Sequence, residues 1–120
     1  MRIYIAAPYT HPDPVENSRK AIMAAESLVK MGHTPFVPHL TLMWHLVAPH
    51  DMEFWYRYDL IWLYHCEGVL RLPGKSKGAD NEVAFAIAEG IPVYRTVAEI
   101  PTTAVTAREF DRICKEFPCE

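Results

Sequence analysis

The stretch GVLRLPGKSKGADNEVAFAIAEGIPVY, residues 68–94, decides the fold. It joins two short apolar runs through a loop rich in Gly and Lys and an alanine-rich segment. This order predicts a buried strand over residues 68–72, a helix over 80–89 that Gly90 ends, and a strand over 92–94. Strand, helix and strand at this spacing indicate a parallel sheet.

The rest of the chain repeats this alternation. The expected elements before it are a strand over 2–6, a helix over 14–31, a strand over 34–38 and a helix over 52–64. Asp13 is the expected N-cap of the first helix, and the capping box TARE at 106–109 predicts a last helix. We therefore expect the α/β class and a single domain over residues 1–120. Its architecture is a flavodoxin- or Rossmann-like three-layer sandwich with a mostly parallel sheet of four or five strands.

The composition narrows the class of protein. Half of the 120 residues are apolar and 22% are charged, which suits one globular core. The formal charge of −3 argues against nucleic-acid and anionic-membrane binders, because both carry a basic surplus. No apolar run approaches the roughly 18 residues of a membrane span, and MRIYIAAP enters a strand pattern without a signal peptide. Cys66, Cys114 and Cys119 show no paired spacing and read as free thiols, so we expect a cytoplasmic protein.

The predicted sheet indicates where a ligand binds. Parallel sheets bind ligands at the carboxyl ends of their strands, near the point where the strand order reverses. This rule selects AAPYTH at residues 6–11, which includes Ala7, Pro8 and Tyr9, and PGKSKGADNE at residues 73–82. It also selects the apolar segment PHLTLMWHLVAPH at residues 38–50, after the second strand. Three alternatives are open for this segment: it walls a pocket, forms a subunit contact or packs on the core as a helix.

The loop at residues 73–79 has the composition of an anion site. Gly74 and Gly78 permit backbone conformations that aim several N–H groups at one point, and the helix that follows adds its positive end. The side chains that can bind an anion there are those of Ser76, Lys75, Lys77 and Arg71. A solvated surface turn has the same composition, and the spacing is not that of a Walker loop.

Two carboxylates are candidates for catalysis. Glu82 is expected in the first turn of its helix, where the helix dipole favours the ionised form by up to about 1 kcal/mol. An ionised, fixed carboxylate is what a nucleophile at an anomeric carbon requires. Asp59 lies among Tyr and Trp residues, where burial raises its pKa and suits it to acid–base work. The alternatives are an ordinary helix-terminal acid at Glu82 and a surface ion pair of Asp59 with Arg57.

Histidines do not indicate a metal site. His39, His45 and His50 are separated by six and five residues, which fits no usual zinc spacing, so we expect neither a metal nor a cofactor. His39, at the end of the second strand, either contacts the ligand or is a structural loop histidine.

Taken together, these motifs resemble the nucleoside 2-deoxyribosyltransferase superfamily, including its deoxynucleoside 5′-monophosphate N-glycosidase branch and small uncharacterised relatives. The resemblance covers about Arg2 to Tyr94 and depends on IYIAAPY, DLIWLYHCEGVLRL and SKGADNEVAFAIAEGIPV. Asp59 stands eight residues before Glu67, which replaces a more usual Asp. The spacing of the nucleophile motif is carried by Ser76, Gly78 and Glu82.

The resemblance implies a mechanism. Glu82 attacks C1′ of a (deoxy)ribonucleoside and forms a glycosyl-enzyme, Asp59 assists departure of the base, and Tyr4 orients Glu82. Water as acceptor gives hydrolysis, and a second base gives transfer. Ser76 occupies a position where transferases usually carry an acid, which favours a 5′-monophosphate as substrate.

The resemblance also implies a ligand and an oligomeric state, and it leaves alternatives for the function. We expect a small-molecule nucleotide or nucleoside as ligand and a homodimer or higher homo-oligomer. Arg19 is the one arginine in the first loop and helix that is suited to phosphate. The alternatives to the monophosphate N-glycosidase are a base-exchanging nucleoside 2-deoxyribosyltransferase and a nucleotide-binding module without turnover.

Overall fold

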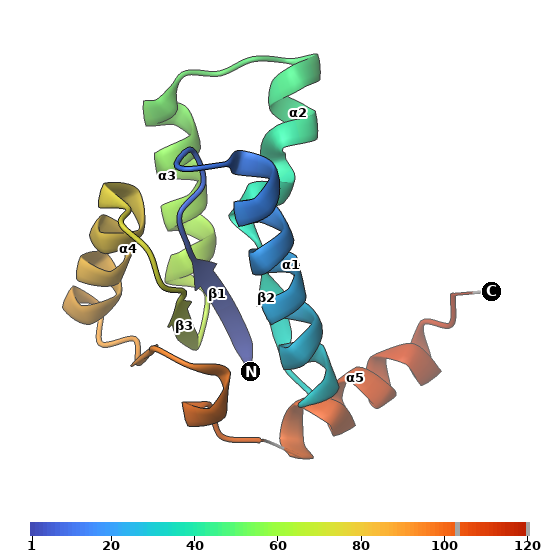
Figure 1. Cartoon of the computed structure of the whole chain (residues 1–120). Helices are drawn as coiled ribbons and strands as arrows, with labels where there is room; N and C mark the ends of the chain where they lie inside the picture. Colours follow the sequence, from blue (N-terminus) through green and yellow to red (C-terminus); the bar gives the residue numbers. More distant parts are fainter. Residues whose placement is uncertain (103, 120) are drawn as a thin grey trace.

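A computed structural model describes residues 1–102 and 104–119, with the side chains of 104–107 and 110 left out (Figure 1). Its strands are β1 (Arg2–Ala6), β2 (Thr34–Phe36), β3 (Gly68–Arg71) and β4 (Val93–Tyr94). Its α-helices are α1 (Pro14–Lys30), α2 (Leu42–Val47), α3 (Met52–Tyr64), α4 (Lys77–Ala88) and α5 (Ala104–Glu116). Two 3-10 helices, η1 (Pro38–Thr41) and η2 (Val97–Glu99), complete these elements.

The four strands form one sheet in the order β2-β1-β3-β4, and every pairing is parallel. The α/β class and the parallel sheet are therefore confirmed, with four strands. The chain moves outward from β1 to β2 and then returns to β3 on the other side of β1. The strand order thus reverses between β1 and β3, and their carboxyl ends are where a ligand is expected.

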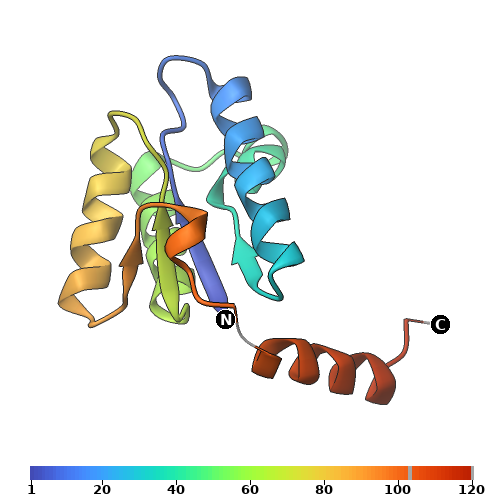
Figure 2. The same ribbon diagram turned by 60° about the horizontal axis from the view of Figure 1, so that its bottom comes forward.

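Helices cover both faces of the sheet, as expected for a three-layer sandwich (Figures 1 and 2). Because side chains alternate along a strand, β1 feeds two cores. Ile3 and Ile5 pack with residues of α1, whereas Tyr4 and Ala6 pack with residues of α3 and α4. All four side chains are fully buried. Tyr4 therefore brings a phenol hydroxyl to the face that α4 covers.

Three boundaries differ from the sequence prediction. The second strand ends at Phe36, two residues early, because Pro38 begins η1. The helix expected from Asp80 begins at Lys77, because the Ser76 hydroxyl oxygen accepts a hydrogen bond from the Ala79 N–H and caps it. The last helix begins at Ala104, two residues before the predicted capping box.

Two segments lie outside the strand–helix alternation that forms the sheet. The apolar segment after β2 forms η1 and α2, and α2 has no buried residue, so it does not pack in the core. Helix α5 extends away from the sheet and its covering helices (Figure 2). In the described ranges, no helix has both the length and the apolar character that a membrane crossing needs.

Candidate active site

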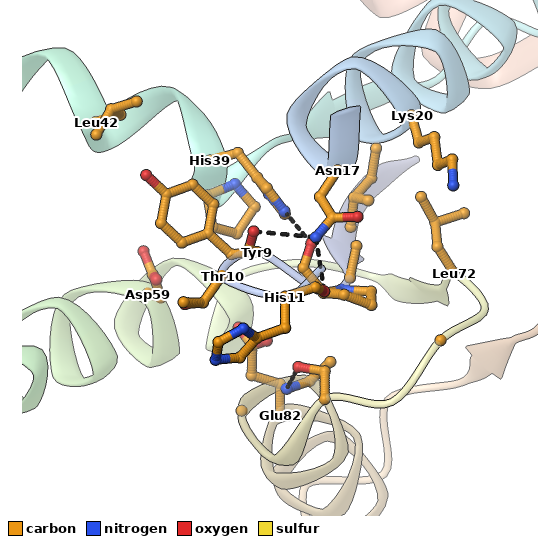
Figure 3. A pocket seen from close by; sticks show the side chains of 18 of the residues that line it. Tyr9, Thr10, His11, Asn17, Lys20, His39, Leu42, Asp59, Leu72 and Glu82 are labelled. Carbon is orange, nitrogen blue, oxygen red and sulfur yellow. Dashed lines mark hydrogen bonds between the residues drawn. The ribbon is translucent and has the colours of Figure 1, made fainter. Parts of the chain in front are cut away.

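A cleft of about 1350 Å³ opens at the carboxyl ends of β1 and β3. Its walls come from the loop after β1, the start of α1, η1 and α2, one side of α3, and the β3–α4 loop. The predicted site residues that line it are Ala7, Pro8, Tyr9, Arg19, His39, Asp59, Ser76, Lys77, Gly78 and Glu82. Figure 3 shows Asp59 from α3 and Glu82 from α4 among the lining side chains. Tyr4 does not line the cleft, but it contacts Glu82 from the buried sheet.

Glu82 lies in the second turn of α4, six residues after the Ser76 cap, and not in the first turn. The helix dipole acts mainly within the first turn, so it is not what governs the charge of this carboxylate. Burial raises the pKa of Glu82 to about 7, against the lowering effect of the hydrogen bond that the Tyr4 hydroxyl donates to Oε2. Tyr4 therefore fixes the carboxylate in place and favours its ionised form.

Asp59 has a different environment. Burial raises its pKa to about 7 as well, and no described residue donates a hydrogen bond to its buried Oδ1. Its charge also raises the pKa of Glu82, so the two carboxylates interact. Since only Glu82 has a donor that stabilises the anion, the arrangement favours a protonated Asp59 beside an ionised Glu82 near neutral pH.

The start of α4 brings groups that are suited to an anion to one end of the cleft. Ser76 caps the helix and lines the cleft with Lys75, Lys77 and Gly78. The N–H groups of Lys77 and Gly78 belong to the first helical turn, where amides have no acceptor within the helix. Such a helix end, with two lysines beside it, is suited to a phosphate.

Arg71 does not lie where it could supply charge to a ligand, as the sequence had suggested. Its side chain is buried, and it is not among the residues that line the cleft. It donates hydrogen bonds to the carbonyl oxygens of Leu72 and Gly74, the latter at 2.9 Å, and forms an ion pair with Asp80 at 3.0 Å. Arg71 therefore stabilises the β3–α4 loop from its buried side, whereas Lys75 and Lys77 line the cleft.

His39 has the structural role that the sequence offered, and its contact with a ligand stays a prediction. Its side chain is buried yet lines the cleft, and its Nε2–H donates to the Pro8 carbonyl oxygen at 2.9 Å. Burial lowers the pKa of His39, which favours the neutral ring. The ring also contacts Tyr9 edge-on, so His39 supports the loop after β1.

Asn17 is a site residue that the sequence prediction missed. Its buried side-chain amide donates to the carbonyl oxygens of Tyr9 and His11, at 3.0 and 2.9 Å, and so fixes the loop after β1 (Figure 3). The position of Asn17 in the sequence could have indicated this role. It lies four residues before Ala21, on the buried side of α1. A polar residue on that side needs hydrogen-bond partners.

The rim of the cleft carries aromatic side chains from α2, α3 and the loop between them, including His45, His50, Trp55 and Tyr56. Within the part of the chain that the structure describes, no group of three or more His, Cys, Asp or Glu is placed to hold a metal ion. The cleft thus combines a carboxylate pair, the N-terminal end of α4 and a group of aromatic side chains.

Comparison with known protein families identifies a family for most of the chain. A family model described as "Domain of unknown function (DUF7768)" matches residues 1–96. The match ends before α5, so a single domain over residues 1–120 stays a prediction. No curated protein sequence matches the chain.

Two solved structures are similar. One is a 2-deoxyribosyltransferase from the psychrotolerant bacterium Bacillus psychrosaccharolyticus, with a TM-score of 0.59 and 21% identity, covering 78% of this chain and 69% of that one. The other is a 2-desoxiribosyltransferase from Leishmania mexicana, with a TM-score of 0.55 and 21% identity, covering 77% of this chain. The chain spans 61% of that second protein. At this identity the likeness shows a shared fold.

Proposed function

The chain belongs to the DUF7768 family, a domain family of unknown function, and we propose that it cleaves the N-glycosidic bond of a (deoxy)nucleoside 5′-monophosphate. The observation that carries this proposal is a pair of partly buried carboxylates: Glu82 accepts a hydrogen bond from the Tyr4 hydroxyl, whereas no described residue donates one to the enclosed Oδ1 of Asp59. A nucleophile and an acid with separate environments are the arrangement that glycosidic cleavage uses.

The proposed reaction has two steps. An ionised Glu82 oxygen bonds to C1′ while the C1′–N bond breaks, and Asp59 transfers its proton to the departing base. Water then attacks C1′ of the glycosyl-enzyme, Asp59 accepts a proton from that water, and Glu82 is released as a carboxylate. The products are the free base and a sugar 5′-phosphate.

The length of α4 supports a phosphorylated substrate. Six residues separate Ser76 from Glu82, a rise of about 9 Å along the axis. Helical side chains lean toward the N-terminus, so the Glu82 carboxylate lies closer to the helix start than its Cα atom does. The resulting gap suits a ribose 5′-phosphate with its phosphate at Lys75, Ser76 and Lys77 and its anomeric carbon at Glu82.

A chromatographic assay tests the proposal. The protein is incubated with nucleosides and with their 5′-monophosphates, and the released free base is measured. Base released from monophosphates alone supports the proposed hydrolase. Base exchange between unphosphorylated deoxynucleosides supports a transferase, the second candidate, which the fold shared with two 2-deoxyribosyltransferases favours. Nucleotide binding without release from any substrate supports a binding module.

The lysines at the start of α4 give a sharper prediction. We expect Lys77→Ala to raise KM for a 5′-monophosphate about tenfold, because one charge-assisted contact to phosphate is lost. The KM for the matching nucleoside should change little. Lys30→Ala, which removes an exposed lysine from the far end of α1, is the control. Equal effects on both substrates would show that Lys77 does not meet the phosphate.

We also propose that the chain forms a homodimer or higher homo-oligomer. The support is a set of exposed apolar side chains on η1, α2 and α3, namely Leu40, Met43, Leu46, Val47, Ile61 and Trp62. Apolar side chains that stay exposed on three successive elements are candidates for a protein contact. Light scattering should give at least twice the mass of one chain, and Leu46→Lys should lower it. A monomer at micromolar concentration would contradict the proposal.

A further inference from the structure

Three residues at the rim of the cleft form a hydrogen-bonded group. The indole Nε1–H of Trp55 donates to Nδ1 of His45 at 2.8 Å, and the backbone N–H of His50 donates to the same nitrogen at 3.3 Å. All three residues line the cleft. His45 comes from α2 and Trp55 from α3, so the group joins the two helices.

These contacts determine the tautomer of His45. An indole N–H and a backbone amide donate hydrogen bonds and cannot accept them, so Nδ1 must carry a lone pair. The proton of the neutral ring is then on Nε2. The Trp55 indole and the His50 backbone amide both require this tautomer. Rotation of the His45 ring by half a turn would lose both hydrogen bonds.

The Nε2–H of His45 is available to a ligand. No residue in the described part of the chain hydrogen bonds to this nitrogen, and it is not among the enclosed side-chain atoms that lack a partner. Because His45 lines the cleft, the rim presents a donor whose direction is set by Trp55.

The position of this donor relative to Asp59 indicates what it meets. Met52, Trp55, Tyr56 and Asp59 follow each other at helical spacing on one side of α3, and all four line the cleft. Trp55 lies one turn before Asp59, toward the rim. A base whose glycosidic end is at Asp59 can therefore extend along this wall toward Trp55 and its partner His45.

We propose that His45 is a specificity-determining residue that selects bases with a carbonyl oxygen on their far edge over bases with an amino group there, and that Trp55 is its positioning residue. This inference rests on the proposed function for the placement of the base. A carbonyl oxygen accepts from Nε2–H, whereas an amino group brings two donors together and leaves both unpaired. A mismatch of this kind lowers kcat/KM by about tenfold to hundredfold.

The test compares inosine 5′-monophosphate with adenosine 5′-monophosphate, which differ in the group at C6 and in the proton on N1, and deoxyuridine with deoxycytidine 5′-monophosphate. The wild type should prefer the carbonyl member of each pair by tenfold or more. His45→Phe and Trp55→Phe should bring both ratios close to one. Trp62→Phe, which alters an exposed tryptophan outside the cleft, should leave them unchanged. The ¹⁵N shifts of the His45 ring should report Nε2–H in the wild type and lose this signature in Trp55→Phe.

Binding of free bases separates this inference from the proposed function. Calorimetry with Glu82→Gln measures affinity for hypoxanthine and for adenine without turnover. Tighter hypoxanthine binding that depends on Trp55 supports the inference, even if no nucleotide is cleaved and the proposed function fails. Equal affinities, absent binding of both bases, or ratios that Trp55→Phe leaves intact overturn it.

Discussion

The Glu82→Gln variant is expected to lose base release by at least about 10³-fold, because an amide cannot form the glycosyl-enzyme bond. The substitution keeps the shape of the side chain and an oxygen that can accept from the Tyr4 hydroxyl. Its fold should therefore be unchanged by circular dichroism. The measurement is the single-turnover rate of base release from the best substrate in the nucleotide panel.

A control and a direct observation accompany this prediction. Glu89→Gln changes an exposed carboxylate at the C-cap of the same helix and should retain full activity. Mass spectrometry of wild-type protein quenched during turnover should find the sugar on the peptide that contains Glu82. Base release by Glu82→Gln at a rate near wild type would place the nucleophile elsewhere.

The second large effect is expected from Asp59→Asn, which should lower activity and raise stability together. Loss of a general acid costs about 10²- to 10⁴-fold in rate. Burial raises the pKa of Asp59 from 3.8 to about 7, so the folded protein holds this proton more tightly than the unfolded chain does. Stability is then greatest below the unfolded pKa and falls as the pH rises toward 7.

An asparagine removes this pH dependence. At pH 5 the variant and the wild type should unfold at similar denaturant concentrations, since Asp59 is protonated in the fold. At pH 8 the variant should be more stable by about 2 kcal/mol, after allowance for partial exposure of the carboxylate. Asp111→Asn, at an exposed site on α5, is the control. Equal stabilities of variant and wild type at pH 8 would contradict a partly buried Asp59 whose Oδ1 has no donor among the described residues.

The fold could be predicted from the sequence because the signals that specify its strands and helices are local. The buried runs at residues 2–6 and 68–72 fall on β1 and β3, and Asp13 and Asp51 cap α1 and α3 by short-range contacts. The ends of β1 and β3 then placed the cleft by a rule of parallel sheets. The positions of most candidate residues could therefore be predicted before their contacts were known.

What the sequence did not predict depends on tertiary contacts. Ser76 and Asp80 are both good helix caps, but in the structure Ser76 caps α4 and the Asp80 carboxylate pairs with Arg71. That ion pair forms only when strand and helix are in place. The contact of His45 with Trp55 likewise crosses a turn between two helices and leaves no motif in the sequence. Tyr4 was expected from the family resemblance, and the alternation of β1 explains why its hydroxyl reaches Glu82.

The buried guanidinium of Arg71 has a consequence for how this domain can diversify. Because Arg71 binds the backbone of the β3–α4 loop at Leu72 and Gly74, and Ser76 caps α4, the course of the loop does not depend on the side chains at positions 75 and 77. Those two positions can be exchanged without a change of the main chain. A descendant, or a designed variant, can thus alter the charge at this end of the cleft while Glu82 and Asp59 stay where they are.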